Sequence, residues 1–202
     1  MNRLNKKGIS PVIATVIIVS VAIAIAVAVA FWMTGITGLF TRYERVEITN
    51  CYADWNTTCN CWLIVIQLRN SGSDDATLDE IFINGRPHAA ITNLTDTAIG
   101  CYNGKVSPHL SDGTYSDTAP TTTAPYVVND TTNKKYVYVS GFSQFDFTDG
   151  VPLKAGEDMT IVIIMAGPGA KDNQVPFRHG ASIEVKLHTA AGKEYPKTVV
   201  LP

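Results

Sequence analysis

Charge is absent from one long stretch of this 202-residue chain, because residues 8–41 contain no Asp, Glu, Lys, Arg or His. The sequence also lacks a basic patch of the kind that binds nucleic acid. It has no nucleophile elbow, phosphate-binding loop, dinucleotide fingerprint or catalytic carboxylate motif. We therefore expect neither nucleic-acid binding nor catalysis, and we expect no cofactor. The chain consists instead of an uncharged N-terminal segment joined to a polar, mildly acidic body.

The uncharged segment is long enough to cross a membrane, since a run of about 18 or more apolar residues predicts a transmembrane helix. Within it, residues 21–30 read VAIAIAVAVA, an alternation that would otherwise favour a strand. A lone strand in lipid leaves its backbone polar groups unpaired, whereas a helix pairs them internally. We therefore predict a helix over residues 9–45. Thr15 and Ser20 are tolerable there because their hydroxyls can bond back to carbonyls of the preceding turn.

Helical geometry gives the alternation a second meaning. At about 100° per residue, Ala22, Ala26 and Ala30 form one row, and Ala24 and Ala28 form a second row on nearly the opposite side. Small residues let helix backbones approach closely, so two opposed rows favour a helix with neighbours on more than one side. The alternative is a solitary anchor in which alanine only moderates hydrophobicity.

The segment is also longer than a bilayer requires. About 20 residues span the hydrocarbon core, and residues 12–31 would suffice, with Phe31 and Trp32 as aromatic anchors at the outer interface. The excess length predicts either tilt or burial against other copies. Gly35 and Gly38 weaken the helix beyond that interface and would let it bend or melt locally.

The leader MNRLNKKG, residues 1–8, carries Arg3, Lys6 and Lys7 and no acidic residue. Positive residues mark the cytoplasmic side of a membrane segment, so we expect the body to lie outside the cell. An ordinary secretory signal has a shorter apolar core followed by a small-residue cleavage site. A basic leader that ends in Gly directly before a long apolar run indicates a different processing route.

The stretch KKGISPVIATVIIVSVAIAIAVAVAFWMTG resembles the N-terminus of archaeal type IV pilins. Those proteins carry a class III signal peptide, which is cut on the cytoplasmic side just before the hydrophobic helix. The resemblance implies that Lys6, Lys7 and Gly8 end the leader and that Ile9 is the first mature residue. SPVIAT, residues 10–15, matches the pattern common in these pilins. Archaellins usually have a Gly-richer start, so an adhesive pilin is favoured over a swimming filament.

The resemblance has further implications and one departure. The acidic residue that bacterial type IV pilins carry at mature position five is absent, and Ile13 stands there, so its charge pairing cannot assist assembly here. The family implies other copies of the same chain as the main partner, together with a prepilin peptidase, an assembly ATPase and a membrane platform protein. It also implies a precursor in the cell membrane and a mature subunit in an extracellular adhesion filament.

From Val46 onward the sequence changes to patterns typical of strands. In residues 62–69 the apolar face is formed by alternate residues, and Gln67 and Arg69 point the other way. Asn84-Gly85 predicts a tight turn. Further strands are expected at residues 77–83, around DMTIVIIMAG, in a final pair joined at residues 190–192, and near residues 126–128 and 136–139. The sequence therefore predicts an α+β chain, a long apolar helix followed by an immunoglobulin-like β-sandwich of about seven or eight strands over residues 46–202.

Residues 86–134 differ from the rest of the body, being rich in Thr, Asn, Asp, Ser and Pro. A structureless loop of this length is unusual in a compact domain. We therefore expect an insertion that contains some short strands and covers one side of the sandwich.

The four cysteines Cys51, Cys59, Cys61 and Cys101 lie in the part expected outside the cell, which predicts two disulfide bonds. A Cys59–Cys61 bond is the least favoured, because so small a ring strains the geometry. Cys51–Cys59 with Cys61–Cys101 is preferred among the pairings. A four-cysteine zinc site is the alternative, but the spacing lacks the usual C-x2-C pair.

Three Asn-x-Thr sequons, at Asn56, Asn93 and Asn129, are candidate glycosylation sites, and all three fall in predicted turns or loops. The four histidines are expected to be ordinary surface residues, since no two have metal-ligand spacing: His88, His109, His179 and His188. The acidic residues between 74 and 80 fit no EF-hand loop, so we expect no metal site.

Three functions fit this sequence to different degrees. The leading hypothesis is a structural subunit that polymerises through its N-terminal helix into an extracellular filament for adhesion. An archaellin-like motility subunit is a variant of it. A membrane-tethered binding module that never polymerises needs the same helix and head. A tethered hydrolase is disfavoured for want of a catalytic set.

Overall fold

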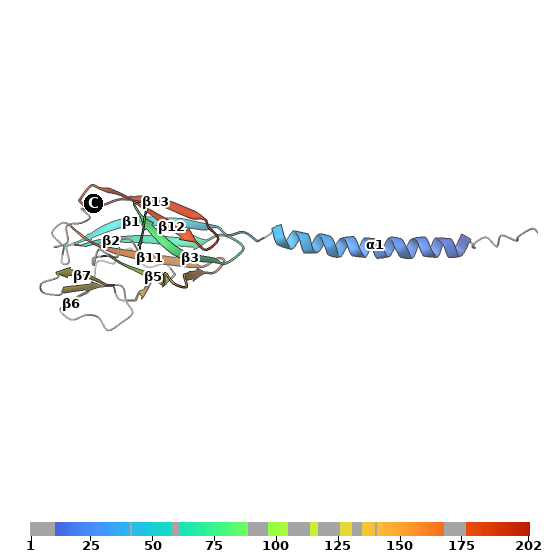
Figure 1. The fold of residues 1–202 in the computed structure, drawn as a ribbon, viewed down its shortest axis with the longest axis horizontal. Helices are drawn as coiled ribbons and strands as arrows, with labels where there is room; N and C mark the ends of the chain where they lie inside the picture. Colours follow the sequence, from blue (N-terminus) through green and yellow to red (C-terminus); the bar gives the residue numbers. More distant parts are fainter. Residues whose placement is uncertain are drawn as a thin grey trace, which may run out of the picture. The chain divides into compact units, whose positions relative to one another are not determined.

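The computed structural model describes residues 11–40, 42–57, 61–88, 97–104, 114–116, 126–130, 135–139, 141–167 and 177–202. The chain divides into two units, Met1–Tyr43 and Glu44–Pro202, which we describe separately (Figure 1). As described, the first unit holds one helix, and the second, which we call the head, holds three β-sheets. The predicted α+β architecture, an apolar helix followed by a β-sandwich head, is confirmed.

Helix α1 extends from Pro11 to Phe40. Pro11 suits a first-turn position, because its fixed φ and missing N–H cost little there. The predicted range of 9–45 is too long at its C-terminal end, since Arg42–Arg45 are not helical. The backbone there is bonded elsewhere: the Arg45 carbonyl accepts a hydrogen bond from the Ser71 amide of the head.

The strands of the head pair antiparallel throughout the described sheets. Sheet A has the order β1 (Val46–Asn56), β2 (Cys61–Asn70), β11 (Asp158–Ala166), β5 (Thr97–Asn103) and β9 (Ser143–Gln144). Sheet B has the order β10 (Val151–Leu153), β3 (Ala76–Ile83), β12 (Ser182–Thr189) and β13 (Glu194–Val200), with β4 (Arg86–Pro87) paired to β3. Sheet C has the order β6 (Thr114–Ser116), β8 (Lys135–Tyr138) and β7 (Tyr126–Asp130).

Sheets A and B enclose the main hydrophobic core between them. The predicted apolar face of β2 lies in it, and Ile66 and Leu68 are fully buried. Ile183 and Leu187 of β12 reach it from the opposite sheet. The period-two patterns of these strands thus place their apolar residues in the core, as half-buried strands require.

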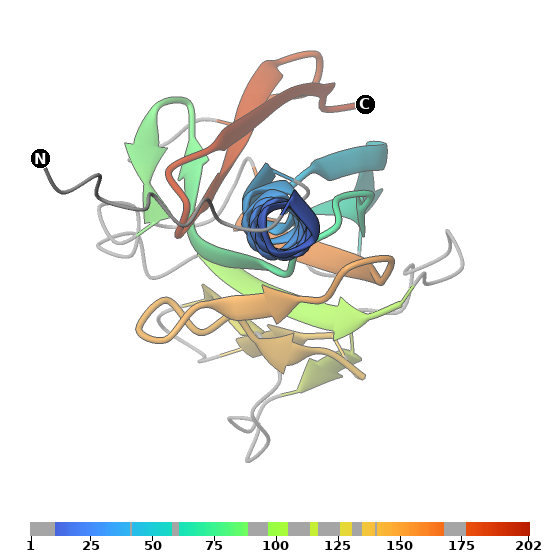
Figure 2. The same cartoon turned by 90° about the vertical axis from the view of Figure 1, so that its right-hand side faces the viewer.

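Sheet A is also covered on its other face. Leu63 and Val65 of β2 and Val162 of β11 are buried there, and Val139 and Phe142 pack over them. Strand β7 contacts β11 and β5, and Figure 2 shows sheet C and the red C-terminal hairpin of sheet B on opposite sides of the head. Burial on two faces explains why β2 and β11 contain continuous apolar runs, LIVI and IVII, rather than strict alternation.

Two expectations about the head need correction. The described chain has more strands than the predicted seven or eight, because β4, β6, β9 and β10 contain only two or three residues and leave no periodic signal.

The segment 86–134 is not purely an insertion, since β5 lies within it and pairs with β11 from Met159↔Asn103 to Met165↔Thr97. The sequence of β5, TAIGCYN, is too polar to be read as a central strand.

The Asn84-Gly85 turn has the predicted geometry. Asn84 has φ 51° and Gly85 has φ 74°, the two positive angles that a type I′ hairpin turn demands. The Asn84 side chain accepts a hydrogen bond from the Glu184 amide at 3.0 Å, which ties the turn to β12.

Asn70, at the end of β2, holds two turns of the head together. Its side chain is fully buried, and its Nδ2 donates to the carbonyls of Asp74 at 2.9 Å and Leu153 at 3.0 Å. Its Oδ1 accepts from the Gly72 amide at 2.9 Å. The single side chain therefore satisfies three backbone groups, of which the Leu153 carbonyl bond is buried and the other two bonds are partly buried.

We expect Asn70→Ala to lower the free energy of unfolding of the head by about 2 kcal/mol. The substitution leaves the buried Leu153 carbonyl unsatisfied, which costs about 1–3 kcal/mol, and it removes two partly buried hydrogen bonds. Urea unfolding of the full chain in detergent, followed by head fluorescence, measures this. Asn50→Ala, at an exposed position of β1, is the matched control and should change stability little. Equal effects of the two substitutions would contradict this role of Asn70.

Candidate functional site: the apolar helix

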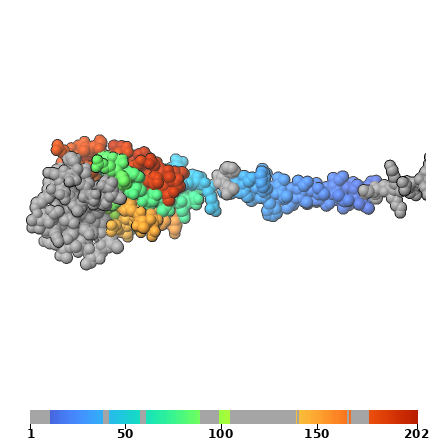
Figure 3. Space-filling view, viewed as in Figure 1, coloured from blue at the N-terminus to red at the C-terminus, as the bar shows by residue number. Residues whose placement is uncertain are grey.

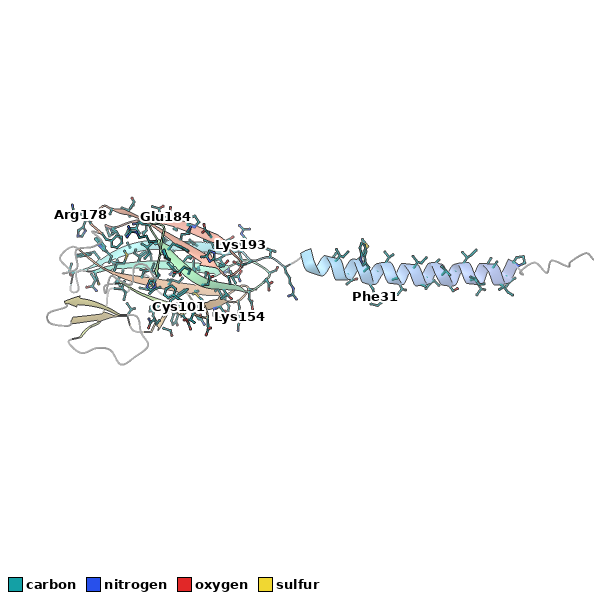
Figure 4. All side chains as sticks on the ribbon, in the orientation of Figure 1. Phe31, Cys101, Lys154, Arg178, Glu184 and Lys193 are labelled. Atoms are coloured by element: carbon teal, nitrogen blue, oxygen red, sulfur yellow. The ribbon has the colours of Figure 1, made fainter. Side chains whose placement is uncertain are left out.

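The surface of α1 is apolar around its whole circumference. The helix PVIATVIIVSVAIAIAVAVAFWMTGITGLF has no acidic residue in its first turn and no basic residue in its last turn. Its large side chains project outward, and Phe31 is 77% exposed (Figure 4). In the space-filling view the helix forms the blue rod (Figure 3). A helix without a polar side is stable only when lipid or protein surrounds it.

The four hydroxyl groups of the described helix α1 are satisfied within the helix. Thr15 Oγ1 donates to the Val12 carbonyl at 2.8 Å, and Ser20 Oγ donates to the Ile17 carbonyl at 2.9 Å, as predicted. Thr34 and Thr37 make equivalent bonds to the preceding turn. The four hydroxyls therefore present no unpaired donor to an apolar surrounding.

The alanine rows lie on this helix as the sequence indicates. Ala22, Ala26 and Ala30 follow one side and Ala24 and Ala28 the other, and all five are exposed. A shallow groove lies toward the N-terminus of the helix. It is lined by Thr15, Val16, Val19, Ser20 and Ile23. At about 100° per residue, Val19 falls on the same side as the first alanine row, so the groove continues that row.

The glycines of α1 do not interrupt it, because the helix continues past both to Phe40. No atom lies within 4 Å of a Cβ placed on Gly35 or Gly38. These positions therefore add two further places where a neighbouring backbone could approach closely.

By length and composition, the stretch Pro11–Gly38 is the one helix of the described residues that could cross a membrane. The predicted leader residues Lys6, Lys7, Gly8 and Ile9 lie outside the described residues. The cleavage site consequently stays a prediction.

The predicted disulfide pairs are wrong, because Cys51 and Cys101 are free thiols. Cys51, Ile66, Ile161 and Cys101 form one row across sheet A, so the two thiols are about 14 Å apart at normal strand spacing. Cys61 faces the opposite side of the sheet from Cys101, which excludes their pairing. Cys61 is itself disulfide-bonded, and its partner lies outside the described residues.

The free thiols are poor nucleophiles. Burial raises the pKa of both Cys51 and Cys101, although Lys197 acts against this at Cys51. Among the described residues, no group of three or more His, Cys, Asp or Glu side chains is arranged to hold a metal ion.

The sequons do not all lie in loops. Asn56 is the last residue of β1 and only 8% exposed, and its glycosylation stays a prediction. Asn129 belongs to strand β7, and Asn93 lies outside the described residues. The expectation that these sequons lie in loops is wrong for Asn56 and Asn129. Both belong to polar parts of their strands, which give no periodic signal.

The histidines differ from one another. His188 Nδ1 lies 2.7 Å from Asp79 Oδ1 on the outer face of sheet B, and His109 lies outside the described residues. His179 is exposed and lies edge-on to Trp55 and Trp62, with centroids 4.9 Å and 4.7 Å away. Trp62 belongs to the main core, and Trp55 packs against that core. Sequence reasoning missed this aromatic group, although two tryptophans on either side of a turn were a usable signal.

His88 is not the surface residue that we expected. It is 9% exposed and its ring stacks on Phe147 at 4.2 Å with an interplanar angle of 10°. Its Nε2 is buried without a hydrogen-bond partner, and its backbone amide donates to Glu80 Oε1 at 3.1 Å. Burial lowers the pKa of His88 below its ordinary value near 6.5.

Comparison with known proteins gives no family. No protein-family model matches the sequence, and no curated protein matches it. The archaellum periplasmic stator protein FlaG from Sulfolobus acidocaldarius is similar in structure with a TM-score of 0.30 and 13% identity, over 77% of this chain and 99% of that one. The archaeal flagellum of Methanospirillum hungatei gives 0.35 and 11%, over 94% and 88%.

A third similar structure is a protein of a different kind. AvmM, which catalyses macrocyclisation in alchivemycin A biosynthesis, gives a TM-score of 0.28 and 11% identity, over 80% of this chain and 88% of that one. All three scores are low, so the similarities assign no family and carry no functional conclusion.

We expect the head to lose stability as the pH falls below about 6.5, because the unfolded chain then binds a proton at His88 more readily than the folded head does. His88→Phe keeps a ring on Phe147 and removes this titration. The loss in urea midpoint between pH 7.5 and pH 5.0 should therefore be smaller in His88→Phe than in the wild type. Equal losses would contradict a role for His88 in acid sensitivity.

Proposed function

We propose that this chain is a structural subunit of an extracellular archaeal filament of the type IV pilin kind, and that it polymerises through α1. The observation that carries the proposal is the apolar surface of α1, which is exposed on every side over Pro11–Gly38. Before assembly the surrounding apolar medium is the membrane. In the filament it is the same helix of other copies.

The arrangement of small residues supports protein contacts in addition to lipid contacts. Packing between helices in an apolar medium relies on close backbone approach, because burial from lipid into protein gains little hydrophobic free energy. Two opposed alanine rows offer such approach on two sides, as a helix in the middle of a bundle requires. Gly35 and Gly38 extend the possibility toward the end of α1.

The basic leader supports a processed precursor. In the proposal, a prepilin peptidase cuts after Gly8, so that Ile9 becomes the first residue, and an assembly ATPase and a membrane platform protein move the mature subunit into the filament. The precursor lies in the cell membrane with its N-terminus in the cytoplasm, and the heads face the exterior. The proposed role of the filament is adhesion, and the subunit is not an enzyme.

The second candidate is a membrane-tethered binding module that never polymerises, which the same helix and head would serve. An archaellin-like motility subunit is a variant of the first candidate, the filament subunit. The residues SPVIAT after the leader favour the adhesive pilin over that variant.

Two measurements on the native protein separate these candidates. Mass spectrometry should find an N-terminus at Ile9 for a pilin and at Met1 for a simple tether. Electron microscopy of material sheared from the cell surface should show long thin fibres that contain this chain. Monodisperse particles obtained only in detergent, with Met1 retained, would instead support the tether.

Bulky side chains in an alanine row should prevent assembly. We expect Ala22→Trp with Ala26→Trp to reduce the number of fibres per cell at least about tenfold, because helices that pack through small residues cannot approach past an indole ring. Fibre counts by electron microscopy, normalised to the chain in the membrane fraction, measure this.

Ile25→Trp is the matched control, since Ile25 is already large and 59% exposed and lies between the two rows. It should reduce the fibre count less than the double substitution. Undiminished fibres in the double variant would eliminate helix packing through this row as the basis of assembly.

A further inference from the structure

The first residues of the head are bonded to the turn after β2, to the β12–β13 turn and to strand β13. The side-chain ammonium of Lys193, labelled in Figure 4, donates to the Glu44 carbonyl. The Ser71 amide donates to the Arg45 carbonyl at 2.8 Å. The Val46 amide donates to the Tyr195 hydroxyl at 3.3 Å. We call these three contacts the N-terminal clamp.

The turns that supply the clamp are themselves well supported. In the β12–β13 turn, the Thr189 amide donates to the Lys193 carbonyl at 3.0 Å, and the Gly192 amide donates to the Thr189 carbonyl at 2.7 Å. Ser71 directly follows Asn70, whose buried side chain organises the turn after β2. The clamp therefore fastens residues 44–46 to two hydrogen-bonded turns and to strand β13.

The start of β1 needs such support. The ladder between β1 and β2 begins at Val46↔Asn70, and its register shifts between Ile48 and Asn50. Only three regular pairs precede this irregularity, and β1 is an edge strand that pairs with β2 alone in the described sheets. The Arg45–Glu47 ion pair at 2.9 Å is well exposed and adds little.

Force on the helix reaches the head at residues 44–46, because the chain connects the helix to the head there. Helix α1 ends at Phe40 and the head begins at Glu44, so tension between a fixed helix and its head passes through residues 41–43. Without the clamp, that tension would open the Val46↔Asn70 pair first and then the next pairs one at a time. With the clamp, contacts to both sheets must break before β1 separates from β2.

We propose that Lys193, Ser71 and Tyr195 form a mechanical clamp that prevents β1 from peeling away from β2 at its helix-connected end. The load that the clamp resists follows from the proposed filament function. The clamp itself is a property of the isolated chain, so its test does not depend on filaments.

The test measures local opening of β1 by hydrogen exchange and mass spectrometry on the full chain in detergent micelles. Lys193→Met with Tyr195→Phe removes two of the three contacts and keeps the apolar parts of both side chains. We expect the amides of residues 46–50 to exchange about five- to tenfold faster, as the loss of two ordinary hydrogen bonds predicts. The amides of residues 62–69 and 159–165 should keep their wild-type rates.

Two further variants make the result specific. Lys186→Met on the same hairpin removes a 2.9 Å bond to Glu194 and should leave residues 46–50 unchanged. Lys193→Arg retains a cationic donor and, with Tyr195 intact, should restore most of the protection. Wild-type exchange at residues 46–50 in the double variant would overturn the proposal, and so would uniformly faster exchange over the whole head. An absence of fibres on cells would count against the proposed function and would leave this measurement unaffected.

Discussion

The structure depends on one constraint. The uncharged helix α1 bonds its hydroxyl groups internally, but no described part of the chain covers its apolar side chains. The hydroxyl groups of Thr15, Ser20, Thr34 and Thr37 all bond to carbonyls of the preceding turn. The large Val, Ile, Phe and Trp side chains of α1 face outward. Such a helix has no stable state in water by itself. Its environment, lipid first and then other copies in our proposal, therefore determines where the chain resides and what it assembles into.

The head is organised by different physics. Sheet A is buried on both faces, by sheet B on one side and by Val139 and Phe142 on the other, so its central strands are as apolar as those of a parallel sheet. At the strand ends of the head, Asn70, Ser71 and Lys193 satisfy backbone groups of turns and of residues 44–46. Apolar residues therefore hold the core together, and a different set of polar residues fastens the helix-connected end of the head.

The described free cysteines and histidines of the head have structural roles. Cys51 and Cys101 lie in one row of sheet A with two isoleucines between them, and burial keeps their thiols protonated. His179 covers two tryptophans, and His188 pairs with Asp79. These arrangements agree with a structural subunit whose interactions, in our proposal, are made by the helix and by the exterior of the head.

The sequence by itself determined the elements whose signal is local. The lack of charge over residues 8–41 predicts α1, period two predicts β12, and Asn84-Gly85 predicts its turn, because each depends on neighbours in the chain. Only the tertiary structure decided what depends on distant partners. It placed β5 beside β11, covered the second face of β2, separated Cys51 from Cys101 and buried His88 against Phe147. These outcomes depend on strand order and layer stacking, which residue spacing along the chain does not encode.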